Sequence, residues 1–139
     1  MGSNPLVQLR QYGQSVWCDD IGRDMLLRGD LQKLIDEDGV AGVTSNPTIF
    51  HKAITAGDTY DQEIAGLVAD GAGDDAVMEA LMIKDIGLAA ERLRPVYDQT
   101  AGLDGYVSIE VAPGLAYDTM ATEADVRRIR ALLDHRNVL

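Results

Sequence analysis

Three short β-prone runs, each ending in a polar side chain, constrain the fold more than any other feature of this chain. They are Val16-Trp17-Cys18-Asp19, Gly42-Val43-Thr44-Ser45-Asn46 and Tyr106-Val107-Ser108-Ile109-Glu110, and a fourth run begins at Asn137-Val138-Leu139. Segments with helical patterns separate these runs. This alternation predicts right-handed βαβ units built around a parallel sheet.

Capping and turn residues predict where the helices begin. Asn4-Pro5 and Asn46-Pro47 each combine a good N-cap residue with a proline suited to the first helical position. The longest helix is expected over about 74–97, because its apolar positions recur on one face: Met78, Met82, Ile86, Ala89 and Leu93. The first helix is expected to bury Leu6, Leu9 and Tyr12. Thr122-Glu123-Ala124-Asp125 has the spacing of a capping box and predicts the start of the last helix.

Side chains two residues apart on a strand share a face, so the runs divide into a polar and an apolar side. The small or polar side contains Trp17, Asp19, Gly42, Thr44, Asn46, Tyr106, Ser108 and Glu110. A sheet covered by helices on both faces would have nearly continuous apolar strands instead. A polar face that ends in hydrogen-bonding groups is typical of a barrel interior near its catalytic mouth. The sequence therefore predicts an α/β fold, a partial (β/α)₈ TIM barrel of about three to four β/α units.

A structural interpretation competes with a functional one at each strand end. An Asp or Asn at such a position is most often a turn former or a helix cap, and Asn46 before Pro47 fits that role. Glu110 differs, because Glu is a poor turn former inside a β-branched run and requires a partner or a function when buried. The shared parity of three such residues favours a common site.

Composition and charge exclude several classes of function. A net charge of −11 over 139 residues argues against a nucleic-acid or anionic-membrane partner. No apolar run is long enough to span a bilayer, and no signal peptide is visible, so the cytoplasm is the expected location. Cys18 is expected to pack against the helices as a small apolar group. His51 and His135 lack the spacing of metal ligands, and no metal site is predicted.

These motifs resemble the transaldolase family. The matching segments are Val16-Trp17-Cys18-Asp19-Asp20, Gly42-Val43-Thr44-Ser45-Asn46-Pro47-Thr48-Ile49-Phe50, Val107-Ser108-Ile109-Glu110-Val111 and Leu115-Ala116-Tyr117-Asp118-Thr119. The likeness covers essentially the whole chain. The first strand, with its Trp, is similar to that of the longer bacterial transaldolases, some of which are fused to glucose-6-phosphate isomerase.

The resemblance implies a transferase with a complete (β/α)₈ barrel. Such an enzyme moves a dihydroxyacetone unit from sedoheptulose 7-phosphate to glyceraldehyde 3-phosphate, giving erythrose 4-phosphate and fructose 6-phosphate in the pentose phosphate pathway. Catalysis uses a lysine Schiff base and no cofactor. In the family that lysine lies in a fourth-strand pattern like Asn-Val-Met-Ile-Lys, whose start Asn137-Val138-Leu139 matches. The lysine would follow Leu139 by two residues, on the interior face shared by Asn137 and Leu139.

Motif by motif, the resemblance implies roles for five residues. Asp19 would handle the proton of the substrate hydroxyl during carbon–carbon cleavage. Glu110 would be the acid/base that works through a water molecule when the imine forms and hydrolyses. Asn46, with Thr44 in the layer beneath it, would bind the substrate, and Ser108 would support Glu110. Two carboxylates suit a reaction that requires several proton transfers.

Residues 1–139 are therefore expected to be the N-terminal half of a transaldolase-type barrel, and inactive alone. Lys33 and Lys84 fall on predicted helices and Lys52 lies beyond the strand mouth, so none of them replaces the missing lysine. Three explanations stay open: part of a longer polypeptide, half of a split enzyme completed by a C-terminal half, or a half-barrel that self-associates. Two other functions also stay open, a non-catalytic module that associates or binds sugar phosphates, and a fructose-6-phosphate aldolase-like enzyme.

Overall fold

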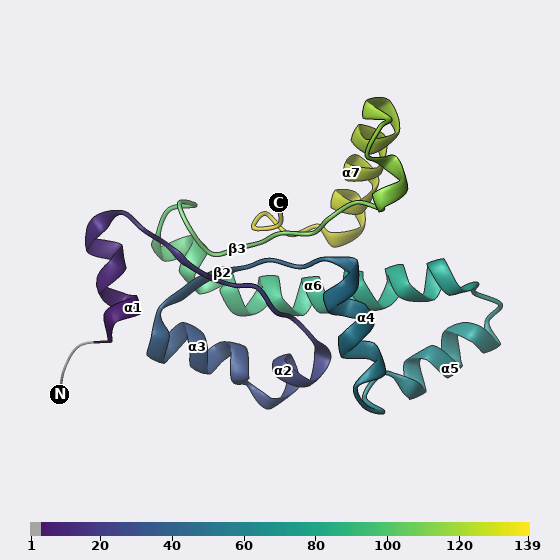
Figure 1. The fold of residues 1–139 in the computed structure, drawn as a ribbon, viewed down its shortest axis with the longest axis horizontal. Coiled ribbons are helices and arrows are strands. Elements are labelled where there is room, and N and C mark those ends of the chain that lie inside the picture. Colours follow the sequence, from purple (N-terminus) through teal and green to yellow (C-terminus); the bar gives the residue numbers. More distant parts are fainter. Residues whose placement is uncertain (1–3) are drawn as a thin grey trace.

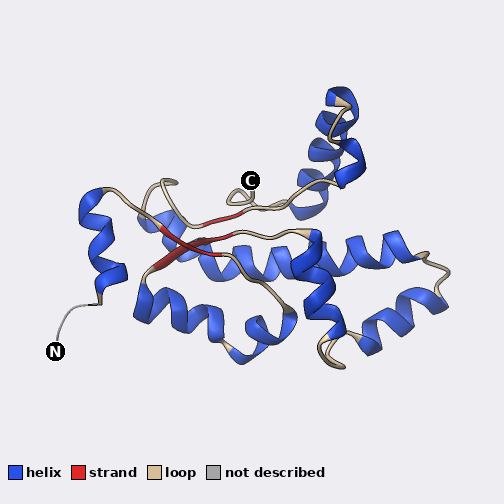
Figure 2. Ribbon diagram, in the orientation of Figure 1, coloured by secondary structure: helices blue, strands red, loops and turns tan. Residues whose placement is uncertain are grey.

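A parallel sheet organises the chain, which the computed structural model describes over residues 4–139 (Figure 1, Figure 2). Its strands lie in the order β1 (Val16–Cys18), β2 (Val40–Val43) and β3 (Tyr106–Val107). The segment 137–139 runs along the free edge of β3, with a parallel bridge between Val138 and Val107. The predicted α/β class and parallel pairing are confirmed.

The helical elements alternate with these strands. In chain order they are α1 (Pro5–Gln8), the 3₁₀ turn η1 (Leu9–Tyr12), α2 (Arg23–Arg28), α3 (Asp30–Asp38), α4 (Pro47–Thr55), α5 (Asp61–Ala69), α6 (Asp74–Gln99), the 3₁₀ turn η2 (Pro113–Leu115) and α7 (Thr119–Leu133). Asn4 and Asn46 accept hydrogen bonds from the backbone N–H groups of Leu6 and Ile49, so both predicted N-caps are confirmed. In residues 4–139 no helix is long and apolar enough to cross a membrane.

One row of small apolar side chains crosses the sheet and faces the helices. Register places Cys18 beside Val43, Val43 beside Val107, and Val107 beside Val138. The three valines are at most 1% exposed and pack in the same core as Leu93 of α6. Helices α2, α3 and α6 lie together on this side of the sheet (Figure 1). The predicted orientation of Cys18 toward the helices is confirmed.

The opposite face carries larger and more polar side chains. Trp17, Gly42 and Tyr106 are neighbours by register on that face. A Cβ atom built on Gly42 would lie 2.3 Å from Trp17 Cε2, so the indole lies directly over this glycine. Trp17 and Tyr106 remain partly exposed, unlike the valine row. The predicted division of the strands into two faces is confirmed.

The expected buried side of the first helix is wrong. Leu6, Leu9 and Tyr12 are 40, 38 and 77% exposed. In Figure 1, α1 lies beyond the end of the sheet rather than across one of its faces. The first helix is attached to the end of α3 instead: Asn4 Nδ2 donates to the carbonyl oxygen of Glu37, and Arg10 Nη2 in η1 donates to the carbonyl oxygen of Gly39, each at 2.9 Å.

The predicted start of the last helix is also wrong. Helix α7 begins at Thr119, and Asp118 is its N-cap, with Oδ1 accepting a hydrogen bond from the N–H of Ala121 at 2.9 Å. Thr122 lies inside the helix, where its hydroxyl donates to the carbonyl oxygen of Leu115. Two capping signals lie four residues apart, and the short η2 turn favours the earlier one.

Asn137 is not on the interior face where parity placed it. Its side chain is fully buried, and Nδ2 donates to the carbonyl oxygens of Ala90 in α6 and of Gly105, each at 2.8 Å. The side chain is therefore directed to α6. Gly105 has φ +87°, and a Cβ there would lie 2.2 Å from the backbone nitrogen of Tyr97, so only glycine fits this approach.

Replacing Gly42 with Ala is expected to lower the free energy of unfolding by about 1–3 kcal/mol, because the new methyl group overlaps the indole of Trp17. Urea unfolding followed by the fluorescence of Trp17, the single tryptophan of the chain, measures the loss. Gly57→Ala is the matched control, because no atom lies within 4 Å of a Cβ at Gly57. Equal stability of G42A and the parent would show that the indole does not cover Gly42.

Candidate active site

The carboxyl ends of β1 and β2 bring Asp19 and Thr44 into contact. Thr44 Oγ1 donates to Asp19 Oδ1 at 2.5 Å, beside the ladder bond from Thr44 N to the carbonyl oxygen of Cys18 at 2.9 Å. Asp19 is exposed on the face opposite the valine row. The hydroxyl of Thr44 thus fixes one carboxylate oxygen and leaves the other open to a ligand.

Asn46 lies two residues beyond Thr44 and serves first as a helix cap. Its Oδ1 accepts a hydrogen bond from the N–H of Ile49 at 3.0 Å, and its backbone is extended, with φ −150° and ψ 165°. Pro47 follows as the first residue of α4. Among residues 4–139 the Nδ2 group of Asn46 has no hydrogen-bond partner, so the amide remains a donor for a bound molecule.

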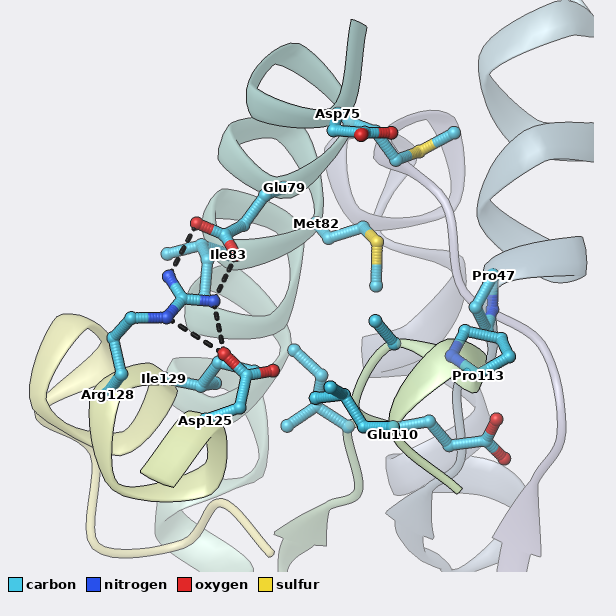
Figure 3. Close-up of a pocket in the computed structure, with 14 residues that line it drawn as sticks. Pro47, Asp75, Glu79, Met82, Ile83, Glu110, Pro113, Asp125, Arg128 and Ile129 are labelled. Atoms are coloured by element: carbon cyan, nitrogen blue, oxygen red, sulfur yellow. Dashed lines mark hydrogen bonds and ion pairs between the residues drawn. The ribbon is translucent and has the colours of Figure 1, made fainter. Parts of the chain in front are cut away.

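Glu110 lies three residues beyond β3 and is exposed. Figure 3 shows its side chain extending away from the Asp125–Arg128 pair, on the side of Pro47. Within the described part of the chain the hydroxyl of Ser108 makes no hydrogen bond to Glu110. Ser108 instead contributes through its backbone, whose N–H donates to the carbonyl oxygen of Val43 at 2.9 Å. Its predicted support of the Glu110 carboxylate stays a prediction.

Ser45 is a functional-site contact that the sequence reasoning missed. It is 2% exposed, and its Oγ donates to the carbonyl oxygen of Ser108 at 2.7 Å. This side-chain bond joins the two chain segments beyond the last backbone bond between β2 and β3. It ties the residue before Asn46 to the segment that leads to Glu110. The available signal was a serine at a helix-facing position, where an apolar residue is expected.

A cavity of about 450 Å³ lies beside Glu110, between α6, α7 and η2 (Figure 3). Its apolar lining includes Met78, Met82, Ile83, Ile109, Leu115 and Ile129. At one side Arg128 pairs with Glu79 at 2.5 Å and with Asp125 at 2.6 Å. The hydrogen bond from Arg128 holds the pKa of Glu79 below its ordinary value. Because Arg128 is already paired with two carboxylates, this apolar cavity is poorly suited to a sugar phosphate.

The site has carboxylates, hydroxyls and an amide, but no lysine of this chain joins them. All three lysines lie in the described part of the chain. Lys33 is on α3 and Lys52 is exposed on α4. Lys84, on α6, donates to Glu63 Oε2 at 2.9 Å. The strand ends therefore offer groups for proton transfer and substrate binding rather than an amine nucleophile.

Comparison with known proteins supports the same family as the motifs. The family model described as transaldolase/fructose-6-phosphate aldolase matches residues 16–139. The chain is 47% identical over 139 residues to a transaldolase of Thermobifida fusca, covering all of this chain and 38% of that protein. It is 48% identical over 129 residues to a transaldolase of Thiobacillus denitrificans, covering 93% of this chain and 36% of that protein. A protein named transaldolase 2 from Nostoc punctiforme is 42% identical over 139 residues, covering all of this chain and 36% of that protein. The chain spans little more than a third of these relatives and belongs to the transaldolase/fructose-6-phosphate aldolase family.

Proposed function

We propose that residues 1–139 form the N-terminal half of a transaldolase-type (β/α)₈ barrel and supply the proton-transfer side of a Schiff-base aldol site. The hydrogen bond between Thr44 and Asp19 carries this proposal, because it fixes a carboxylate at the ends of two adjacent parallel strands. Asn46 and Glu110 lie beyond the ends of β2 and β3, and strand parity assigns both to the same polar face. Catalytic groups of such barrels lie at the carboxyl ends of the strands.

The chemistry assigned to these residues follows the aldol cleavage. An imine between a lysine and the ketose withdraws electrons from the bond to be broken. Asp19 accepts the proton of the adjacent hydroxyl while that carbon–carbon bond breaks, an aldehyde leaves and an enamine remains. In the reverse direction Asp19 returns the proton when the enamine attacks an acceptor aldehyde. Glu110 moves protons through water when the imine forms and hydrolyses, and the Asn46 amide holds substrate hydroxyls.

Transfer of dihydroxyacetone between sugar phosphates in the cytoplasmic pentose phosphate pathway is the function we favour. Sedoheptulose 7-phosphate and glyceraldehyde 3-phosphate would be the substrates. The lysine would come from the fourth-strand pattern that Asn137-Val138-Leu139 begins. Cleavage of fructose 6-phosphate without transfer is the second candidate, since the matching family includes both activities by its description. The relatives compared above, all called transaldolases, favour transfer.

The 139-residue chain by itself is expected to show no measurable transaldolase activity, because no lysine lies at the strand ends. Borohydride reduction with fructose 6-phosphate is expected to leave Lys33, Lys52 and Lys84 unmodified. Intact and peptide mass spectrometry measure this. A stable, substrate-dependent adduct on Lys52 would contradict the expectation, and adducts without sugar serve as the background control.

A chimera tests whether these residues support catalysis. Residues 1–139 replace the matching segment of the Thermobifida fusca transaldolase, and we expect the folded chimera to transfer dihydroxyacetone. Asp19→Asn and Glu110→Gln should each lower its kcat by about 100-fold or more, the usual contribution of general acid–base catalysis. Asp20→Asn, of the opposite parity, is the matched control and should leave kcat nearly unchanged. A folded but inactive chimera would overturn the proposal.

Asn46 has two separable roles in this proposal, as helix cap and as substrate ligand. Asn46→Ala is expected to lower the free energy of unfolding by about 1 kcal/mol, whereas Asn46→Asp keeps a capping oxygen and the parent stability. In the chimera both variants should lower kcat/KM, because both lose the amide donor. Urea unfolding and steady-state kinetics measure the two effects. Parent kcat/KM in N46D would show that the amide does not bind substrate.

A further inference from the structure

A buried charged cluster joins α2, α5 and α6 on the helix side of the molecule. Arg23, Tyr60 and Asp85 are 6, 2 and 0% exposed. Arg23 Nε hydrogen-bonds to Asp85 Oδ1, and the hydroxyl of Tyr60 donates to Asp85 Oδ2 at 2.7 Å. Arg23 Nη1 donates to Glu63 Oε2, also at 2.7 Å. Each of three helical elements thus contributes at least one member of the cluster.

The cluster holds both the backbone and the side chain of Arg23. The backbone N–H of Arg23 donates to the Tyr60 hydroxyl oxygen at 2.7 Å, closing a ring of hydrogen bonds through Asp85. The guanidinium carbon lies 4.9 Å from the centroid of the Tyr60 ring, in the geometry of a cation–π contact. Arg23 is therefore fixed in position and in orientation at the first residue of α2.

The residue held in this way is four positions after Asp19. Between them Ile21 is 1% exposed, and Gly22 lies so close to α4 that a Cβ on it would be 3.0 Å from Cβ of Ala53. Helix α4 begins directly after its N-cap, Asn46. The cluster holds Arg23, and the adjacent Gly22 is the point at which the loop after Asp19 packs against the helix that follows Asn46.

Stability alone does not account for these charges. Burial raises the pKa of Asp85, although the hydrogen bonds from Tyr60 and Arg23 act in the opposite direction. In the described part of the chain Arg23 Nη2 is buried without a hydrogen-bond partner, a further cost. Replacing a buried ion pair with apolar residues of similar size is often neutral or stabilising, whereas removing one partner is strongly destabilising. An apolar core would satisfy the packing at lower cost, but it would not fix direction as hydrogen bonds do.

We propose that Arg23 is a positioning residue that, through Tyr60 and Asp85, holds the loop after Asp19 against α4 and so sets the placement of Asp19 relative to Asn46. The inference rests on the proposed function only in so far as the placement of Asp19 affects catalysis. That Arg23 keeps the loop ordered can be tested without measuring activity.

The experiment compares variants that separate stability from positioning. In the 139-residue chain, Arg23→Met should lower the urea midpoint, and Arg23→Met/Asp85→Leu should restore it. Both are expected to raise amide hydrogen exchange by about tenfold or more at Thr44 and Leu26, whose N–H groups donate to the carbonyl oxygens of Cys18 and Gly22 at the two ends of this loop. Arg28→Met is the matched control, because Arg28 is on the same helix in an exposed pair with Asp24. A double variant with the parent midpoint and the parent exchange rates would overturn the proposal.

Tyr60→Phe provides a milder variant, since it removes only the hydroxyl that joins Arg23 N and Asp85. It should also raise exchange at Thr44 and Leu26, and unchanged exchange at both would count against the proposal. In the chimera, the double variant and Y60F should lower kcat at least tenfold. Arg23→Lys should lower kcat less than the double variant does, but it should not match the parent, because an ammonium cannot reproduce the guanidinium fork. An inactive parent chimera refutes the proposed function, while the exchange rates still decide the role of Arg23.

Discussion

The register of the parallel strands is the constraint on which the rest of this structure depends. Cys18, Val43, Val107 and Val138 form one continuous row because each lies beside the next across the sheet. A slip of one residue in any strand would turn its apolar side chain out of the helix-facing core. Burial of this row therefore also fixes the opposite face, including the contact between Asp19 and Thr44.

Beyond the last backbone hydrogen bonds of the sheet, side-chain hydrogen bonds hold the chain segments that carry the candidate site. The hydroxyl of Ser45 joins β2 to the backbone at Ser108, and Asn46 caps α4. The Thr44 hydroxyl holds Asp19. Three consecutive residues of one strand end thus make three different connections, to β3, to the next helix and to β1.

Much of this could be predicted from the sequence because it depends on local periodicity. Strand parity gave the two faces, and the Asn-Pro pairs at Asn4 and Asn46 gave two helix starts. Contacts between distant segments could not be predicted in this way. The ring through Arg23 and Asp85 joins residues 62 positions apart, and no local pattern marks it. The orientation of Asn137 is another example: parity predicted the interior face, but its side chain is directed to α6 by a hydrogen bond to the backbone there.

The two groups of charged residues differ in what surrounds them, and this difference bears on their roles. Asp85 and Arg23 are enclosed: both carboxylate oxygens of Asp85 accept hydrogen bonds, one from Arg23 Nε and one from Tyr60, and Arg23 also donates to Glu63. Asp19 and Glu110 are exposed and keep carboxylate oxygens free. A carboxylate that must exchange protons with a substrate has to be reachable, whereas one that holds helices in place is best enclosed. On the helix side of the sheet, the charged groups therefore hold helices in place, whereas the carboxylates at the strand ends remain accessible for proton transfer.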